Sequence, residues 1–316
     1  VIGVESAESA CLDAALKAGE PVELEQVGSF ADGVAVKIIG KETFRLAQKF
    51  CDEVVTVSSD EICAAVQDIF VATRAIAEPS GALATAGLTK WSKQCGQTGL
   101  KLAAVLSGAN LNFDRLRYIA ERTALGAKSE ALFGVTIKEE KGSFKRFCHA
   151  LGGRAITEFN YRYAGEGDAQ IFVGVGLRGG QLELDEVKSV LQTNGYGFED
   201  LSDNELAKLH IRYMVGGKPP VPLNEHLYRF EFPEYPGALA RFLETLGSEW
   251  NITLFHYRNH GAAEGNVLAA FDIAPEQQSL FNLHLAKLGY KYWDETDNPC
   301  FAQYLQNQEL EQQQAS

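Results

Sequence analysis

The stretch Val135-Thr-Ile-Lys-Glu-Glu-Lys-Gly-Ser-Phe-Lys-Arg-Phe147 has a second copy further along the chain, Phe230-Glu-Phe-Pro-Glu-Tyr-Pro-Gly-Ala-Leu-Ala-Arg-Phe242. The copies share their apolar pattern, a glycine and a final Arg-Phe pair, and they are offset by 95 residues. Each copy predicts a strand, a turn that contains glycine and the start of a helix. A repeat of this kind indicates two similar modules that follow one another in the chain.

Three further matches extend the repeat: Ile156–Arg162 with Ile252–Arg258, Ile171–Val175 with Val267–Phe271, and Gly195-Tyr196 with Gly289-Tyr290. The resulting order in each copy is strand, helix, strand, strand, helix, strand, which is the βαββαβ unit of ferredoxin-like folds. We therefore expect α+β modules at residues 127–214 and 226–316. The Gly- and Pro-rich stretch 215–225 between them is expected to be a linker. Two such modules can pair their sheets and form symmetric crevices suited to small ligands.

Residues 1–126 have a different pattern, in which strand and helix signals alternate. Strands are expected at Val1–Val4, Val54–Val57 and Lys101–Leu106. Ser58 and Glu61 form a capping-box pattern that opens a helix reaching about Arg74, and Pro79 suits the first turn of the next helix. This order predicts an open, mainly parallel α/β sheet, whose ligands collect where the strands end.

Composition and charge exclude several classes of protein. The net charge of -13 argues against nucleic acid as a partner, because phosphate recognition needs a clustered basic surface. No apolar run approaches the roughly 20 residues of a membrane span, so no membrane partner is expected. Six cysteines are scattered without metal or redox spacing, which suits a reducing compartment. His256 and His260 have helical ligand spacing, but they lie in a strand-like segment, and no metal site is predicted there.

Five stretches together resemble the biosynthetic threonine dehydratases, which are pyridoxal-phosphate enzymes of fold type II: Phe30–Val36, Ala77–Ala82, Leu106–Asn110, Asn160–Arg162 and Phe255–Arg258. The resemblance covers essentially the whole chain. It implies that residues 1–126 are the C-terminal part of the α/β catalytic domain and end in a neck helix. It also implies that the two modules are ACT-like regulatory domains.

The resemblance implies the activity as well. It is the pyridoxal-phosphate-dependent deamination of L-threonine to 2-oxobutanoate and ammonia, the first step of isoleucine biosynthesis. Isoleucine is expected to inhibit through the paired modules and valine to oppose it. A homotetramer is expected, in the cytoplasm, or in a plastid or the mitochondrial matrix of a eukaryote.

Four residues resemble the family's cofactor-binding positions: Ser107, Gly33, Glu78 and Asn110. In this class the hydroxyl at Ser107 faces the pyridine nitrogen, where other classes use a carboxylate. Gly33 resembles a glycine whose backbone approaches the cofactor, although a loop glycine is the alternative. Glu78 resembles a carboxylate beside the ring; alternatively it is a first-turn acid favoured by the helix dipole. Asn110 has the alternative role of bracing its turn.

Two expected elements are missing from the sequence. The lysine to which the family attaches its cofactor and the glycine-rich phosphate loop both lie upstream of the segment that matches Val1. The chain also begins without Met, so we expect it to be a fragment that is inactive alone, with no catalytic residue of its own. The alternative is a non-catalytic amino-acid-sensing protein derived from a lyase remnant. Glu5 and Ser9 lie where related enzymes hold a divalent cation, but the second carboxylate of that pattern falls at Cys11, so no metal is predicted.

The regulatory half carries the candidate effector residues. Tyr161 and Tyr257 occupy equivalent places in the repeat and resemble the family's effector-contacting tyrosines; ordinary strand tyrosines are the alternative. Arg162 and Arg258 follow them and could bind a carboxylate, and Arg212 is a further candidate for the effector network. A surface position is the alternative for the arginines. In the expected neck helix, about residues 112–122, an apolar stripe is predicted at Phe113, Leu116, Ile119 and Ala120.

Overall fold

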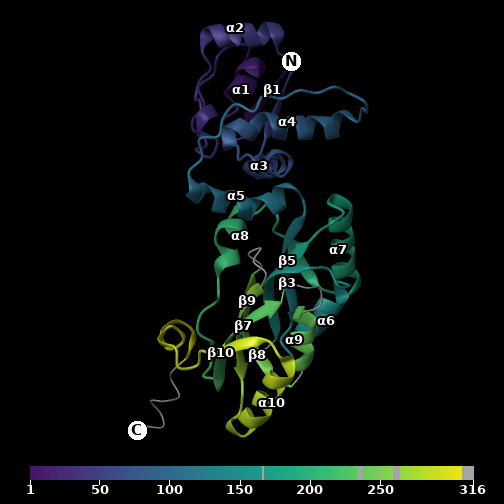
Figure 1. Cartoon of the computed structure of the whole chain (residues 1–316), viewed down its shortest axis with the longest axis vertical. Helices are drawn as coiled ribbons and strands as arrows, with labels where there is room; N and C mark the ends of the chain where they lie inside the picture. The colour runs from purple at the N-terminus through teal and green to yellow at the C-terminus, as the bar shows by residue number, and fades with distance from the viewer. Residues whose placement is uncertain (166, 234–237, 248, 259–263, 308–316) are drawn as a thin grey trace. The chain divides into compact units, whose positions relative to one another are not determined.

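The computed structural model describes residues 1–165, 167–233, 238–247, 249–258 and 264–307. The chain forms two compact units, Val1–Lys128 and Ser129–Ser316, and Figure 1 labels many of their helices and strands. None of the helices in the described residues has the length and apolar character that crossing a membrane requires.

The first unit is built on two parallel strands, β1 (Ile2–Ser6) and β2 (Glu53–Val57), in which Val4 pairs with Val55. The predicted strands at these two places are confirmed, as is their parallel direction. Its helices are α1 (Cys11–Ala18), the 3-10 turn η1 (Asp32–Val34), α2 (Lys41–Phe50), α3 (Ser59–Thr73), α4 (Pro79–Cys95) and α5 (Phe113–Gly126).

Helices α3 and α4 begin where local chemistry predicts. The Ser58 hydroxyl accepts the N–H of Glu61, and the Glu61 carboxylate accepts the N–H of Ser58, so the predicted capping box is present. Pro79 is the first residue of α4, where its missing N–H costs no hydrogen bond. Behind these caps the apolar faces of β2, α3 and α4 form the core of the unit, centred on Val57, Ile62, Cys63, Ala82 and Ala86.

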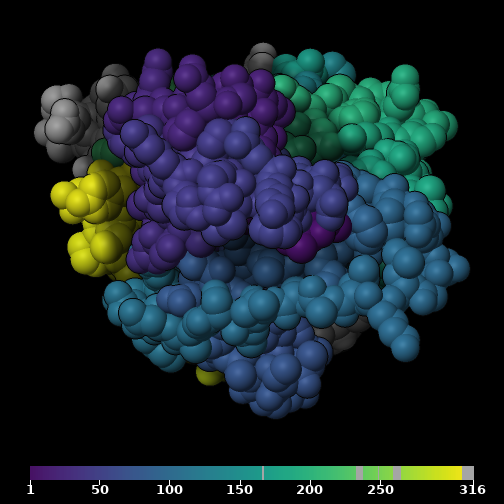
Figure 2. Space-filling model, turned by 90° about the horizontal axis from the view of Figure 1, so that it is seen from above, coloured from purple at the N-terminus to yellow at the C-terminus, as the bar shows by residue number. Residues whose placement is uncertain are grey.

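The predicted strand at Lys101–Leu106 is wrong. This segment has no regular secondary structure, and Val105 is 75% exposed. A strand needs a neighbour for its N–H and C=O groups, and among the described residues the two-stranded sheet offers none here. In Figure 2 the blue segment that follows α4 lies at the surface of the unit.

The neck helix is present as α5, but its predicted apolar stripe is only partly correct. Ile119 is buried, whereas Phe113 is 86% exposed and Ala120 is also exposed. The buried face is set by packing against α3, where the Thr123 hydroxyl donates to the carbonyl of Cys63. Polar contacts, and not apolar spacing alone, therefore determine which face of α5 is buried.

The second unit is one eight-stranded sheet in the order β10-β7-β9-β8-β4-β5-β3-β6. Each half contributes four strands and two helices in the predicted βαββαβ order, which confirms the two ferredoxin-like modules. The first module is β3 (Glu130–Lys138), α6 (Ser143–Ala150), β4 (Ile156–Arg162), β5 (Asp168–Gly176), α7 (Gln181–Thr193) and β6 (Gly197–Asp200). The second is β7 (Glu225–Pro233), α9 (Ala238–Thr245), β8 (Asn251–Arg258), β9 (Glu264–Asp272), α10 (Gln278–Leu288) and β10 (Lys291–Asp294). Within the repeat that predicted these modules, residues 234–237, which include the glycine of the second copy, lie outside the described residues.

The modules join through β4 and β8, which pair antiparallel. Asn160 lies opposite His256, and these two residues occupy equivalent positions in the repeat. The same register places Phe159 opposite Tyr257 and Tyr161 opposite Phe255. The repeat therefore has a local pseudo-twofold axis between Asn160 and His256.

The two faces of this sheet carry different elements. Side chains from one face pack with α6, α7, α9 and α10 into the main core, which includes Phe159, Tyr161, Phe255 and Tyr257. The opposite face is contacted by the segment that contains α8 (Glu205–Leu209) and the turn η2 (Ile211–Tyr213), and by the short helix η4 (Phe301–Leu305). Strand alternation decides which face each predicted effector residue reaches.

Candidate cofactor and effector sites

At the start of α4, the predicted cofactor residue Glu78 contacts Gly108, the residue that follows Ser107. The N–H of Glu78 donates to the carbonyl of Gly108 at 3.1 Å. A Cβ at Gly108 would collide with the Glu78 carboxylate, and a Cβ at Gly81 would collide with the Gly108 carbonyl oxygen. The backbone after Ser107 is therefore pressed against α4 in a way that only glycine permits, and this contact holds the Ser107 segment beside Glu78.

Gly33 reaches the same turn from the other side. Its N–H donates to the Asp32 carboxylate at 3.0 Å, and a Cβ at Gly33 would lie 2.9 Å from the Ser80 hydroxyl oxygen. That hydroxyl is buried and has no hydrogen-bond partner among the described residues. Asn110 is exposed, and the described structure gives it no contact with this cluster. The fold thus gathers Gly33, Glu78 and the Ser107 segment, and it leaves Asn110 at the margin.

Among the residues considered as metal ligands, Glu5 has a structural role. The Glu5 carboxylate accepts the N–H groups of Leu12 and Asp13 at 2.9 and 2.8 Å, and so it caps the start of α1. His256 lies on β8, and His260 lies outside the described residues. Within the part of the chain that the structure describes, no group of three or more His, Cys, Asp or Glu side chains is placed to hold a metal ion.

Tyr161 is buried on the helix-covered face of the sheet. Its hydroxyl donates to Glu139, with both carboxylate oxygens at 2.7 Å, and its ring meets the Phe144 ring edge-on at 4.7 Å between centroids. Burial raises the pKa of the Tyr161 hydroxyl, and the hydrogen bond to Glu139 raises it further. Burial also raises the pKa of Glu139. Tyr257 is buried on the same face, where its ring centroid lies 6.2 Å from that of Phe232.

The partners of Tyr161 line a narrow crevice between the two modules. Glu139 and Phe144, in the 138–145 segment of the first module, face Leu243, Gly247 and residues 250–252 of the second. Lys141 bridges the modules, because its ammonium donates to the carbonyl of Glu249 at 3.1 Å. The crevice has a volume of about 20 Å³, which is room for one water molecule. Glu139 was not predicted from the sequence; its place before the repeated glycine was the available signal.

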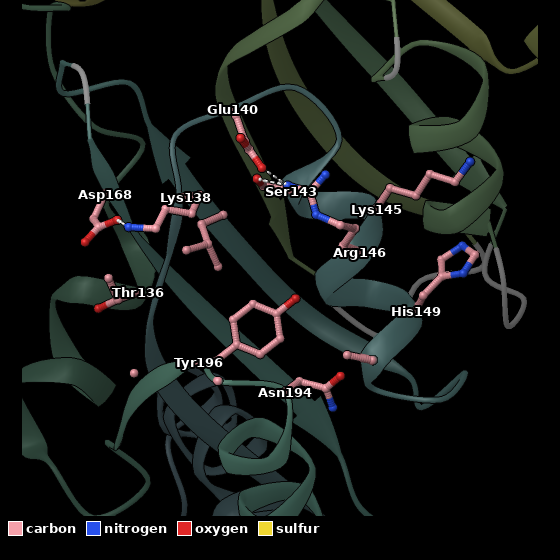
Figure 3. Close-up of a pocket in the computed structure, with 14 residues that line it drawn as sticks. Thr136, Lys138, Glu140, Ser143, Lys145, Arg146, His149, Asp168, Asn194 and Tyr196 are labelled. Atoms are coloured by element: carbon pink, nitrogen blue, oxygen red, sulfur yellow. Dashed lines mark hydrogen bonds and ion pairs between the residues drawn. The ribbon is translucent and has the colours of Figure 1, made fainter.

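A larger groove lies at the edge of the first module, between α6 and the strands β3 and β6. It has a volume of about 970 Å³. Lys138 pairs with Asp168 at 2.6 Å on one side, and Tyr196 faces the groove from the other (Figure 3). Lys145 and His149 project from α6 away from the Lys138–Asp168 pair. None of these residues was predicted as a site, and the repeated Gly195-Tyr196 pair was the one signal for the groove.

The structure does not bring the arginines to the tyrosines. Successive strand residues point to opposite faces, so Arg162 projects from the face opposite to Tyr161. All five N–H donors of Arg162 are used: its acceptors are the carbonyl oxygens of Gly217, Thr253 and Leu305 and both oxygens of Glu225. Arg162 therefore has no donor left for a ligand carboxylate, and it fastens the linker and η4 to the sheet.

Arg212 and Arg258 lie in a buried ion cluster on the same face as Arg162. Arg212 donates from Nε to Glu158 at 2.9 Å and from a terminal nitrogen to Glu130 at 3.4 Å. Arg258 contacts the same Glu158 oxygen at 2.9 Å, and its guanidinium stacks over Tyr213. Burial raises the pKa of Glu158, although Arg212 opposes the shift. The two arginines thus neutralise two buried carboxylates and tie the modules together.

Comparisons with known proteins give a family match for each of the two units. Residues 121–211 and 218–305 match the C-terminal regulatory domain of threonine dehydratase, and residues 1–108 match the pyridoxal-phosphate dependent enzymes. The chain is 58% identical over 305 residues to L-threonine dehydratase biosynthetic IlvA of Escherichia coli strain K12, which covers 96% of this chain and 59% of that protein. It is 46% identical to the mitochondrial threonine dehydratase of Saccharomyces cerevisiae, over 96% of this chain and 55% of that protein.

A solved structure of the processed form of threonine deaminase isoform 2 from Solanum lycopersicum is 38% identical, with a TM-score of 0.38. That likeness covers 38% of this chain and 35% of the other. The chain thus spans a little over half the length of the curated relatives named above.

The cluster at α4 fits the cofactor that the enzyme family implies. Gly33, Gly81 and Gly108 allow close approach of backbone, and the buried Ser80 hydroxyl has no hydrogen-bond partner in the part of the chain that the structure describes. Ser107 would hold the pyridine nitrogen and Gly33 would lie against the bound molecule. When bound, pyridoxal phosphate supplies an electron-withdrawing ring that stabilises negative charge at the substrate Cα. Since the regulatory-domain match covers more than half of the residues and the enzyme match precedes it, the chain belongs to the threonine dehydratase family.

Proposed function

We propose that this chain is part of a pyridoxal-phosphate-dependent threonine ammonia-lyase, which converts L-threonine to 2-oxobutanoate and ammonia in the first step of isoleucine biosynthesis. The observation that carries this proposal is the hydrogen bond from Glu78 to Gly108. It sets the Ser107 segment beside the first turn of α4, where Gly33 also arrives. The 58% identity to a biosynthetic threonine dehydratase supports the same substrate.

The residues of this chain would bind and orient rather than transfer protons. Ser107 offers a neutral hydroxyl to the pyridine nitrogen, and a neutral partner leaves that nitrogen largely unprotonated. A weaker electron sink favours loss of the β-hydroxyl over transamination. Gly33 gives the substrate room, and Glu78 orients groups beside the ring.

The 316 residues alone are expected to release no 2-oxobutanoate from threonine, because the family's lysine lies in the segment upstream. A longer protein that contains this chain together with that segment is expected to release it. Measuring 2-oxobutanoate from both preparations tests the proposal. Absence of turnover in the longer protein would instead favour an amino-acid-sensing protein without catalysis.

We infer that isoleucine binds at the crevice between the modules and inhibits, and that valine opposes it. Tyr161 supports this placement, because Glu139 and Phe144 connect it to the crevice wall. A crevice of about 20 Å³ is smaller than an amino acid, so binding requires the 138–145 segment to move outward. Calorimetry with isoleucine tests the site, with Tyr257→Ala as the control. Unchanged binding in that variant would remove Tyr257 from the site.

We further propose a homotetramer located in the cytoplasm, or in a plastid or the mitochondrial matrix if the source is a eukaryote. Relatives named mitochondrial and chloroplastic support the second location for eukaryotic sources. Light scattering on the longer protein measures the assembly directly, and a mass of four chains is expected.

A further inference from the structure

We propose that Arg115 is a positioning residue that ties the neck helix α5 to the loop carrying Gly33, and so links the helix to the cofactor site. The inference rests on the lyase function proposed above. Arg115 donates from one terminal nitrogen to the carbonyl of Phe30 at 3.3 Å. Its other terminal nitrogen donates to the Asp32 carboxylate, also at 3.3 Å. One side chain of α5 thus holds two points of the loop.

The next contacts lead from Asp32 to α4. The second oxygen of the Asp32 carboxylate accepts the N–H of Gly33 at 3.0 Å. Gly33 in turn lies so close to Ser80 that a Cβ would stand 2.9 Å from its hydroxyl oxygen. Ser80 belongs to the first turn of α4, which also contacts the segment after Ser107. A displacement of Arg115 would therefore be transmitted to Gly33 through the Asp32 carboxylate alone.

Tyr118, one turn further along α5, supports the same loop. Its ring lies 5.1 Å from the Phe30 ring, and its hydroxyl accepts a hydrogen bond from Arg122 at 2.6 Å. Beside these contacts lies a cavity of about 470 Å³ between the loop and the helix. The loop is consequently held against α5 by a few contacts, with space beside them into which it can move.

Position in the chain makes α5 suitable for transmission. The helix ends at Gly126, and the first strand of the regulatory modules begins at Glu130. Arg115 is partly exposed, with a side-chain accessibility of 35%, so its ion pair is not required to hold the core together. The loop is also anchored in the core of the unit by the buried Ala31, so the contacts of Arg115 adjust the position of the loop rather than hold it alone.

The first test uses hydrogen exchange on the 316-residue chain. Arg115→Gln is expected to speed exchange of the amides at residues 30–36 about fivefold, the size of effect that loss of a partly exposed ion pair produces. Arg117→Gln is the matched control, because Arg117 is two residues away and pairs with Glu121 at the surface. The control is expected to leave the loop unchanged, and Arg115→Lys to restore part of the protection. Unchanged exchange in Arg115→Gln, or an equal effect of Arg117→Gln, overturns the proposal.

The second test uses the longer protein with threonine and isoleucine. In Arg115→Gln the factor by which isoleucine lowers the rate of 2-oxobutanoate release is expected to fall about fivefold or more, since coupling between two sites is a free energy that this contact carries. Arg117→Gln is expected to keep the wild-type factor. An unaltered factor in Arg115→Gln overturns the inference. If the wild-type protein releases no 2-oxobutanoate, the proposed function fails, and the exchange experiment still decides whether Arg115 positions the loop.

Discussion

At the scale of single residues, strand alternation determines which face of the sheet each predicted effector residue reaches, and sequence similarity does not show this. Tyr161 and Arg162 are neighbours in the chain, yet one is buried beneath the helices and the other fastens the linker and η4 on the opposite face. The sequence could suggest both as effector residues, because each has a plausible chemistry. It could not show that the guanidinium of Arg162 is already saturated, because its acceptors come from residues 55 to 143 positions away.

Removal of the Tyr161 hydroxyl tests the polar contact behind the crevice. Tyr161→Phe leaves the half-buried Glu139 carboxylate without this donor, so the free energy of unfolding is expected to fall by about 1–2 kcal/mol. Urea unfolding measures this loss, and calorimetry on the same variant is expected to show weaker isoleucine binding. Tyr163→Phe, two residues along the chain, is the control and should change neither quantity. If Tyr161→Phe binds isoleucine with the affinity of the wild type, this hydroxyl does not contribute to the effector site.

Glu139 also predicts a dependence of stability on pH. Because burial raises its pKa in the folded state, its contribution is fully present below the unfolded pKa of about 4.5 and is lost as the pH rises through the folded pKa. Relative to Glu139→Gln, the wild type should therefore lose stability as the pH rises across this window. Unfolding at several pH values measures the difference. Glu140→Gln, an exposed neighbour, should keep the wild-type dependence; equal behaviour of the two variants contradicts the assignment.

At the scale of elements, local signals were reliable where the responsible interactions are local. The capping box at Ser58 and the proline at the start of α4 determine helix ends through contacts within a few residues. The segment Lys101–Leu106 shows the opposite case, because its apolar residues indicate a strand and the described sheet supplies no neighbour. The buried face of α5 could not be predicted from local sequence either, because it depends on packing against α3.

The turn η2, which carries Arg212, shows how long-range contacts hold an element. Arg212→Ala would leave Glu158 and Glu130 buried with less compensating charge, and it is expected to destabilise the chain by about 3–5 kcal/mol. Lys138→Ala is the comparison: its pair with Asp168 has a lysine that is 73% exposed, so no measurable loss of stability is expected. Chemical unfolding of both variants provides the measurement. Similar losses would show that burial of the Arg212 cluster has no special importance.

At the scale of the whole chain, the repeat predicted two modules and the possibility that their sheets pair. The register was not predictable, because nothing in either copy shows that Asn160 lies opposite His256. The candidate cofactor cluster was predictable only in part. Ser107, Gly33 and Glu78 come from a recognisable pattern, whereas Ser80 and Arg115 emerge only when residues far apart in sequence meet.

The most direct test of the account is the rate of 2-oxobutanoate release from L-threonine by the longer protein, with pyridoxal phosphate present and isoleucine added in increasing amounts. The enzyme domain and the paired modules together predict release without isoleucine and a progressive fall as isoleucine is added. No release from threonine, or a rate that does not respond to isoleucine, would contradict the account of a regulated threonine ammonia-lyase.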